Sequence, residues 1–166
     1  MGLDITAYAR IKPHRDYVDG EDLPSYLEHF RVNDEWNRAP EIDGSKVYLF
    51  DVQMGFSAGS YGGYNDWRDA LARLAGYPPV DDPDTARRYA PGAWQAPEGP
   101  FWELINFTDC DGTIGAAVAA KLAKDFAEFD DRAKAAVTPC NWFYEVYQDF
   151  RAAFEMAARN GAVVFH

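Results

Sequence analysis

The sequence predicts an α+β fold in a single domain over residues 1–166, with a small mixed β-sheet covered by about three helices. Its content of 48% hydrophobic and 16% aromatic residues is typical of a folded globular chain. A chain of 166 residues is long enough to bury one sizeable hydrophobic core, which makes a single domain the default expectation. Short apolar segments of strand type stand apart from segments with helical periodicity, which favours α+β over other classes.

Four segments have the pattern of strands. Residues 3–11 alternate apolar and polar types and are ended by Pro13. Residues 46–56 form the most apolar strand candidate, and residues 101–107 follow the same pattern. Residues 162–166 predict a closing strand, which we expect to pair inside the sheet because an exposed apolar edge invites aggregation.

Three segments have helical periodicity. The first covers about 65–75, with Asn65 as its N-cap and Gly76 as its stop. The second covers 114–129, and the third covers 139–160 with Thr138 as its cap. Their expected core faces are Trp67, Leu71 and Leu74, then Val118, Leu122 and Phe126, and finally Phe143, Val146, Tyr147, Phe150 and Phe154.

The remaining segments are predicted to be loops. Residues 14–45 are polar, with a short helix expected at 23–30. Residues 55–64 form a glycine-rich connector, and residues 77–100 form a long proline-rich loop with one helical turn near 85–89. Loops of that length are uncommon unless they are functional or mobile.

Composition limits the classes of partner. The chain carries 27 acidic and 16 basic residues, for a net charge of −11. Such a balance argues against nucleic acid or an anionic membrane, because both require clustered Lys and Arg. It is compatible with a basic protein partner. The chain shows no apolar run near the roughly 20 residues of a membrane span. With Cys110 and Cys140 far apart, we expect a cytoplasmic protein with free thiols.

Residues 55–59 match the G-x-S-x-G pattern of the nucleophile elbow in α/β-hydrolases. Ser57 would be the nucleophile, Asp109 or Asp111 the acid, and His166 the base. However, the helix should begin at the serine, and a histidine at the last position would be poorly held. A glycine-rich turn is the preferred interpretation.

Residues 108–113 (Thr-Asp-Cys-Asp-Gly-Thr) match the DxDGT motif of haloacid-dehalogenase-type phosphatases. In that motif the first Asp attacks phosphorus, and the second acts as acid and base beside Mg²⁺. The context differs, because such enzymes place further strands after the motif, whereas mostly helices follow here. We therefore predict a structural turn, in which Gly112 has positive φ and Thr113 caps the next helix.

No metal or cofactor is expected. The acids at 109–111 lack the loop pattern of an EF-hand, which leaves only a weak hard-cation site as an alternative. The candidate zinc ligands have no diagnostic spacing; they are Cys110, Cys140, His14, His29 and His166.

Residues 57–67 are the candidate for a small-molecule site. Their glycines would let backbone N–H groups approach a ligand at the start of a helix. The phosphate-loop lysine is absent, and Asp66 and Asp69 would repel an anion. A neutral ligand stacked on Tyr61, Tyr64 and Trp67 fits better.

Four blocks carry a resemblance: residues 1–5 (Met-Gly-Leu-Asp-Ile), 60–68 (Ser-Tyr-Gly-Gly-Tyr-Asn-Asp-Trp-Arg), 105–115 (Ile-Asn-Phe-Thr-Asp-Cys-Asp-Gly-Thr-Ile-Gly) and 121–126 (Lys-Leu-Ala-Lys-Asp-Phe). With these the chain resembles a family of proteins of unknown function from bacteria and their phages. The resemblance covers about half of the chain and implies no activity.

The leading hypothesis is a non-enzymatic acidic interaction protein, phage-derived, that binds a host protein. The alternative is a small-molecule-binding protein or a metal-assisted hydrolase that uses 57–67 and 109–113. Both segments are expected at the same sheet edge, following parallel strands. The candidate ligand-binding residues are Tyr61, Tyr64, Asn65, Trp67, Arg68, Asn106, Asp109 and Asp111.

Overall fold

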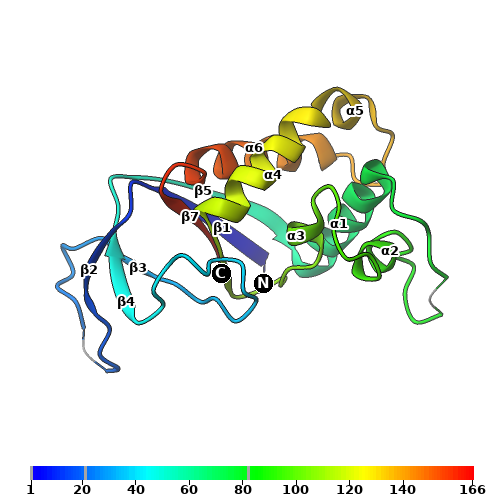
Figure 1. The fold of residues 1–166 in the computed structure, drawn as a ribbon. Helices are drawn as coiled ribbons and strands as arrows, with labels where there is room; N and C mark the ends of the chain where they lie inside the picture. Colours follow the sequence, from blue (N-terminus) through cyan, green and yellow to red (C-terminus); the bar gives the residue numbers. More distant parts are fainter. Residues whose placement is uncertain (1, 21, 82) are drawn as a thin grey trace.

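The computed structural model describes residues 2–20, 22–81 and 83–166 (Figure 1). In chain order its elements are β1 (Gly2–Ala9), β2 (Lys12–Asp16), β3 (Phe30–Arg31), β4 (Lys46–Leu49), β5 (Val52–Ser60), α1 (Tyr61–Ala75), α2 (Ala90–Trp94), α3 (Trp102–Ile105), β6 (Gly112–Gly115), α4 (Ala116–Glu128), α5 (Asp130–Ala135), α6 (Phe143–Ala157) and β7 (Gly161–Phe165). The predicted α+β class is confirmed.

The strands form two sheets, in the orders β5-β1-β7-β6 and β2-β4-β3. All pairs between described strands are antiparallel, so the prediction of one mixed sheet is wrong. The closing strand β7 lies between β1 and β6, as its apolar sequence predicted. In Figure 1, α4 and α6 cover one face of the larger sheet, while β2, β3 and β4 stand at one end.

The two sheets share a long bent ribbon. β1 and β2 run antiparallel to β5 and β4, with the bend at Arg10 (φ 53°) and Asp51. The Asp51 carboxylate accepts hydrogen bonds from Arg10 Nε (3.0 Å) and Lys12 Nζ (3.4 Å) at this corner. The predicted strand 46–56 is therefore two strands, one in each sheet. Residues 55–60 belong to β5 and are not a loop.

Both faces of the larger sheet are buried near its centre. Along β7, Val163 and Phe165 face the helices, whereas Ala162 and Val164 belong to a second cluster under the smaller sheet. A strand that is buried on two sides needs apolar residues at successive positions. This burial explains the uninterrupted run at the end of the chain.

The helices bury the faces that their periodicity predicted. In α6, Phe143, Tyr147 and Phe150 are among the residues buried against the sheet. The helix α1 begins four residues earlier than expected, because the Ser60 hydroxyl accepts a hydrogen bond from Gly63 N (3.1 Å) and acts as N-cap. Asn65 is therefore not an N-cap, because it lies inside α1. Thr138 is not an N-cap either, because α6 begins only at Phe143.

The segment 101–107 is not a strand. Phe101 adopts a left-handed conformation (φ 56°), and its N–H donates to Asp125 Oδ2 at 2.7 Å. The chain then makes the short helix α3, which buries Leu104 and Ile105. With only two polar residues, Glu103 and Asn106, in so short a run, the pattern does not separate a strand from a short helix.

The turn and strand at 109–115 also differ from expectation. Residues 112–115 form β6 and pair with β7, so α4 starts after them. Gly112 does not have positive φ, and glycine is needed there for space. A Cβ at this position would lie 2.7 Å from Phe107 Cζ and 2.8 Å from Thr108 Cγ2. Thr113 does not cap a helix; its hydroxyl accepts a hydrogen bond from Asn33 N (3.0 Å).

The proline-rich segment after α1 is anchored to that helix. Asp69 Oδ1 accepts hydrogen bonds from Tyr89 N (2.7 Å) and Ala90 N (2.8 Å), and Arg87 pairs with Asp66 (2.8 Å). These bonds fix the position of α2, which lies just after the predicted turn at 85–89. Likewise, 23–30 holds turns and the start of β3 in place of the expected helix.

Candidate functional site

The start of α1 and the turn 109–111 meet at one edge of the larger sheet. β5 ends there at Ser60, opposite the first residue of β1, and β6 begins there at Gly112, opposite Phe165 near the end of β7. The prediction that the two segments share an edge relied on parallel strands, which is wrong. They meet because β5 ends at this edge and β6 begins at it.

Three of the predicted site residues form one hydrogen-bonded group at this edge. Asn65 Nδ2 donates to Asp109 Oδ2 at 2.7 Å, and Arg68 donates to Asn65 Oδ1. The Arg68 guanidinium also donates to the carbonyl oxygens of Phe107 and Ile105. Only 7% of Arg68 is exposed. The group therefore ties α1 to the segment that follows α3, which is a structural role.

The aromatic residues of α1 do not form the predicted stacking surface. Tyr64 and Trp67 are fully buried in the core, and Trp67 Nε1 donates to Phe143 O at 3.0 Å. Burial raises the pKa of Tyr64 well above its ordinary value. The Tyr64 hydroxyl has no hydrogen-bond partner within the described ranges. Tyr61 is half-buried against the same core, so the three rings do not form one exposed stacking surface.

A surface recess of about 300 Å³ lies beside the Arg68 group. We call it the tryptophan recess; its lining consists of Trp36, Arg68, Trp94, Ile105, Asn106 and Phe107. Trp36 is 45% exposed and Trp94 is 53% exposed, unusually high for such large apolar side chains. Trp94 Nε1 donates to Ile105 O at 3.4 Å, and Trp36 meets the Phe107 ring edge-on at 6.1 Å between centroids.

Hydrogen bonds fix the orientation of the Asn106 amide in the lining of the tryptophan recess. Its Nδ2 donates to Trp102 O (3.2 Å) and Ala93 O (3.3 Å). Within the described ranges, its Oδ1 accepts no hydrogen bond. The recess thus offers two indole side chains and one amide oxygen. The cationic group in its lining, Arg68, is already bonded to backbone carbonyls. So is Arg38 beside it, which donates to Trp36 O (3.2 Å) and Asn106 O (3.4 Å).

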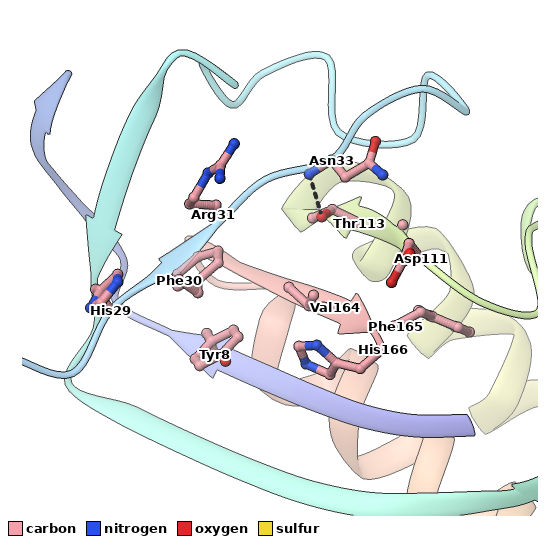
Figure 2. A pocket seen from close by; sticks show the side chains of 11 residues that line it. Tyr8, His29, Phe30, Arg31, Asn33, Asp111, Thr113, Val164, Phe165 and His166 are labelled. Carbon is pink, nitrogen blue, oxygen red and sulfur yellow. Dashed lines mark hydrogen bonds between the residues drawn. The ribbon is translucent and has the colours of Figure 1, made fainter. Parts of the chain in front are cut away.

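Asp111 does not join Asp109. It lines a different cavity of about 420 Å³ at the seam of the two sheets, together with His166 (Figure 2). Ser57 is not among the residues that line this cavity, and its hydroxyl accepts a hydrogen bond from Gly59 N (3.4 Å). The serine triad suggested by the G-x-S-x-G pattern is therefore not assembled, and the two aspartates of the DxDGT pattern face different surroundings.

The described part of the chain contains no group of three or more His, Cys, Asp or Glu side chains that could hold a metal ion. Cys110 lies in the exposed turn, where its Sγ is 3.2 Å from Thr108 Oγ1, and Cys140 is half-buried. Among the described residues, no helix is both long and apolar enough to cross a membrane.

Sequence reasoning identified Arg68 and Asn106 but missed the two tryptophans beside them. A signal for Trp36 was present, because it stands in a polar stretch (Asn-Asp-Glu-Trp-Asn-Arg, 33–38) without an apolar neighbour to continue a core face. Trp94 is the last residue of α2, directly after four buried residues. Its exposure therefore depends on where this short helix ends. Comparisons with protein-family models, with curated proteins and with solved structures give no match to this chain.

Proposed function

We propose that this chain is a non-enzymatic interaction protein that binds a partner protein at the tryptophan recess. The observation that carries the proposal is the pair of half-exposed indoles, Trp36 and Trp94, in the lining of one recess. Tryptophan is enriched among the residues that contribute most to protein binding energy, especially in pockets from which water is excluded on binding.

The chemistry of the recess supports a basic side chain as its occupant. Arginine and lysine bind well over the face of tryptophan, and arginine can also donate to a neutral oxygen. The free Oδ1 of Asn106 supplies such an acceptor, and Glu35 is exposed beside Trp36. The net charge of −11 would attract a basic segment over longer distances. We therefore infer an arginine-bearing segment of a partner protein.

A direct test uses a short peptide with one arginine between apolar residues. The matched peptide carries citrulline, which keeps the shape and removes the charge. We expect the arginine peptide to shift the indole N–H signals of Trp36 and Trp94 in NMR spectra and the citrulline peptide to bind more weakly. Equal binding of the two peptides, or shifts confined to other residues, would contradict the proposed chemistry.

A pull-down from a bacterial lysate then tests the biological partner. The variant Trp36→Ala/Trp94→Ala should lose proteins that the parent chain captures. Tyr26→Ala is the matched control, because Tyr26 is 85% exposed and does not line the recess. The bacterial and phage setting implied by the sequence resemblance would make the partner a host protein. Identical capture by all three chains would refute an interaction role for the recess.

A further inference from the structure

The outer edge of β5 is the side of the larger sheet that faces no other described strand. β5 stands at one end of the order β5-β1-β7-β6, and Figure 2 shows it as the outermost strand, in pale blue-green along the bottom, with β1 beside it. Its regular part is 52–57, because the register with β1 shifts beyond Ser57. No residue of β5 lines the tryptophan recess, so this edge is independent of the proposed function.

The hydrogen bonds of β1 show which way the backbone groups of β5 point. The backbone groups of successive residues in a strand point to opposite sides. Asp4 O accepts a hydrogen bond from His166 N (2.9 Å), toward β7, whereas Ala9 O accepts one from Asp51 N (3.3 Å), on the β5 side. The odd-numbered residues of β1 therefore bond to β5, where even-numbered residues face them. It follows that the odd-numbered residues within 53–57 direct their N–H and C=O groups outward.

These outward groups are open to another strand. The three residues concerned, Gln53, Gly55 and Ser57, are all exposed. Within the described ranges, their backbone N–H and C=O groups form no hydrogen bond with the rest of the chain. A row of unpaired backbone groups at a sheet edge is a template for pairing with a further strand.

The edges at β6 and β2 are protected, in contrast to β5. β6 is buried, and Gly115 N on this strand donates to Arg38 O (2.9 Å) in the segment that covers it. β2 (Lys-Pro-His-Arg-Asp) contains proline and three charged residues, which are common means of preventing edge association. β5 (Val-Gln-Met-Gly-Phe-Ser-Ala-Gly-Ser) contains neither, although the chain has a net charge of −11.

We propose that β5 pairs antiparallel with β5 of a second copy of this chain, about a two-fold axis at Gly55. Gly55 then faces its own copy, and Gln53 faces Ser57 of the partner subunit. Each of these pairs can exchange two backbone hydrogen bonds, because all three residues direct their backbone groups outward. The surface is thus complementary to itself, as a two-fold interface requires.

The side chains agree with this register. Met54 lies opposite Phe56 of the partner subunit, and both residues are half-buried against the core beneath the helices. On the other face of the sheet, the amide of Gln53 lies opposite a hydroxyl. A second copy suits this edge better than a charged strand of another protein, because β5 has no charge to attract one. Two acidic chains also repel each other least where neither carries charge.

Sedimentation velocity of the full chain across a range of concentrations tests the pairing. We expect a reversible dimer with a Kd of roughly 10–100 µM, because an edge contact of this length is smaller than a standard interface of about 1,600 Å². Gly55→Pro should weaken it at least about tenfold, because it removes an outward N–H and keeps the bonds to β1. Gly55→Ala is the control and should dimerise as the parent does, since its Cβ meets only Ile5 O at 3.6 Å. Circular dichroism checks that both variants remain folded.

Charges placed at the two-fold axis test the register. Gly55→Lys and Gly55→Glu each bring like charges directly opposite one another, so each variant alone should dimerise at least about tenfold more weakly than the parent. An equimolar mixture of the two should recover the dimer, because opposite charges then face each other. In any other register, position 55 would not face itself and mixing would bring no recovery.

Three results would overturn the proposal. These are a parent chain that stays monomeric up to about 1 mM, unchanged dimerisation of Gly55→Pro, and lack of recovery in the mixture. An edge reserved for a strand of another protein would give the first of these results. Failure of the peptide titration at the tryptophan recess has no bearing on this outcome, since β5 does not line the recess.

Discussion

Replacement of Arg68 is the sharpest test of how the structure holds the 105–109 segment. Methionine is the substitute of choice, because it keeps the length of the side chain and stays apolar in a buried position. In Arg68→Met, Phe107 O and Asn65 Oδ1 lose the donor Arg68, whereas Ile105 O loses Arg68 and keeps Trp94 Nε1. Asn65 would then hold Asp109 without support from its own partner.

The size of the effect follows from these bonds. A hydrogen bond to a charged group contributes about 1.5–3 kcal/mol to stability. The contact with Ile105 is long at 3.5 Å, so we count only the other two and obtain roughly 3–6 kcal/mol. Removing a buried charge also removes the cost of its desolvation, which favours the lower end. For a chain of 166 residues, about 3 kcal/mol lowers the Tm by roughly 6–12 °C.

Thermal unfolding followed by circular dichroism measures this change. Arg73→Met is the matched control, because Arg73 lies on the same helix, is exposed, and contacts only the face of Tyr89 (5.7 Å) in the contacts described. We expect the control to remain within about 0.5 kcal/mol of the parent chain. If Arg68→Met and Arg73→Met melted at the same temperature, the Arg68 group would not hold this part of the fold.

Three further predictions concern stability. Gly161→Ala should lower the Tm strongly in thermal melts, because the added Cβ would collide with backbone atoms of the neighbouring strand and helix. The control Gly62→Ala in α1 places its Cβ in open space and should stabilise the chain by about 0.5–1 kcal/mol. Asp109→Ala should lower the Tm by a few degrees through loss of one side-chain hydrogen bond, and Asp111→Ala should not; equal melting would contradict the different roles of the two acids. Burial raises the pKa of Tyr77 from its usual 10.0 to about 12, so its stabilising contribution is complete below pH 10 and is lost as the pH rises toward 12. Tyr77→Phe should therefore reduce the loss of stability between pH 10 and 12, as measured by urea unfolding across that range.

The sequence allowed the main helices and the outer limits of the sheet to be predicted. The faces of α1 and α6 were visible because large apolar residues recur at helical spacing, and β7 because it is apolar throughout. The first residues of the helices were harder to predict from the sequence. Ser60 and Asn65 are both good N-caps, and only the position of β5 decides between them.

The elements that sequence reasoning missed depend on tertiary contacts. β6 is four residues long with two glycines, and it is a strand because β7 lies beside it. The bend that separates β4 from β5 lies at Asp51, whose carboxylate is bonded to Arg10 and Lys12, residues far from it in sequence. Phe101 has a left-handed conformation, and its N–H donates to Asp125 on another helix.

The candidate site was predicted in part and for a wrong reason. Asn65, Arg68 and Asp109 do lie together, but antiparallel strands bring them there, and their bonds are structural. Tyr64 and Trp67 were expected to contact a ligand and instead belong to the core. A glycine-rich stretch that leads into a helix occurs in ligand sites and in tightly packed helix starts, so its composition could not separate these cases.

The DxDGT pattern illustrates how a catalytic motif can arise from packing. Asp109 binds Asn65, and Gly112 leaves room for Phe107 and Thr108. Thr113 holds Asn33, the residue that begins the segment carrying Trp36 to its recess. A second hydrogen bond holds the other end of that segment, since Gly115 N donates to Arg38 O at 2.9 Å. Among the described residues of this pattern, the Asp111 side chain alone lacks a hydrogen bond or an ion pair, and it is the acid that faces the cavity.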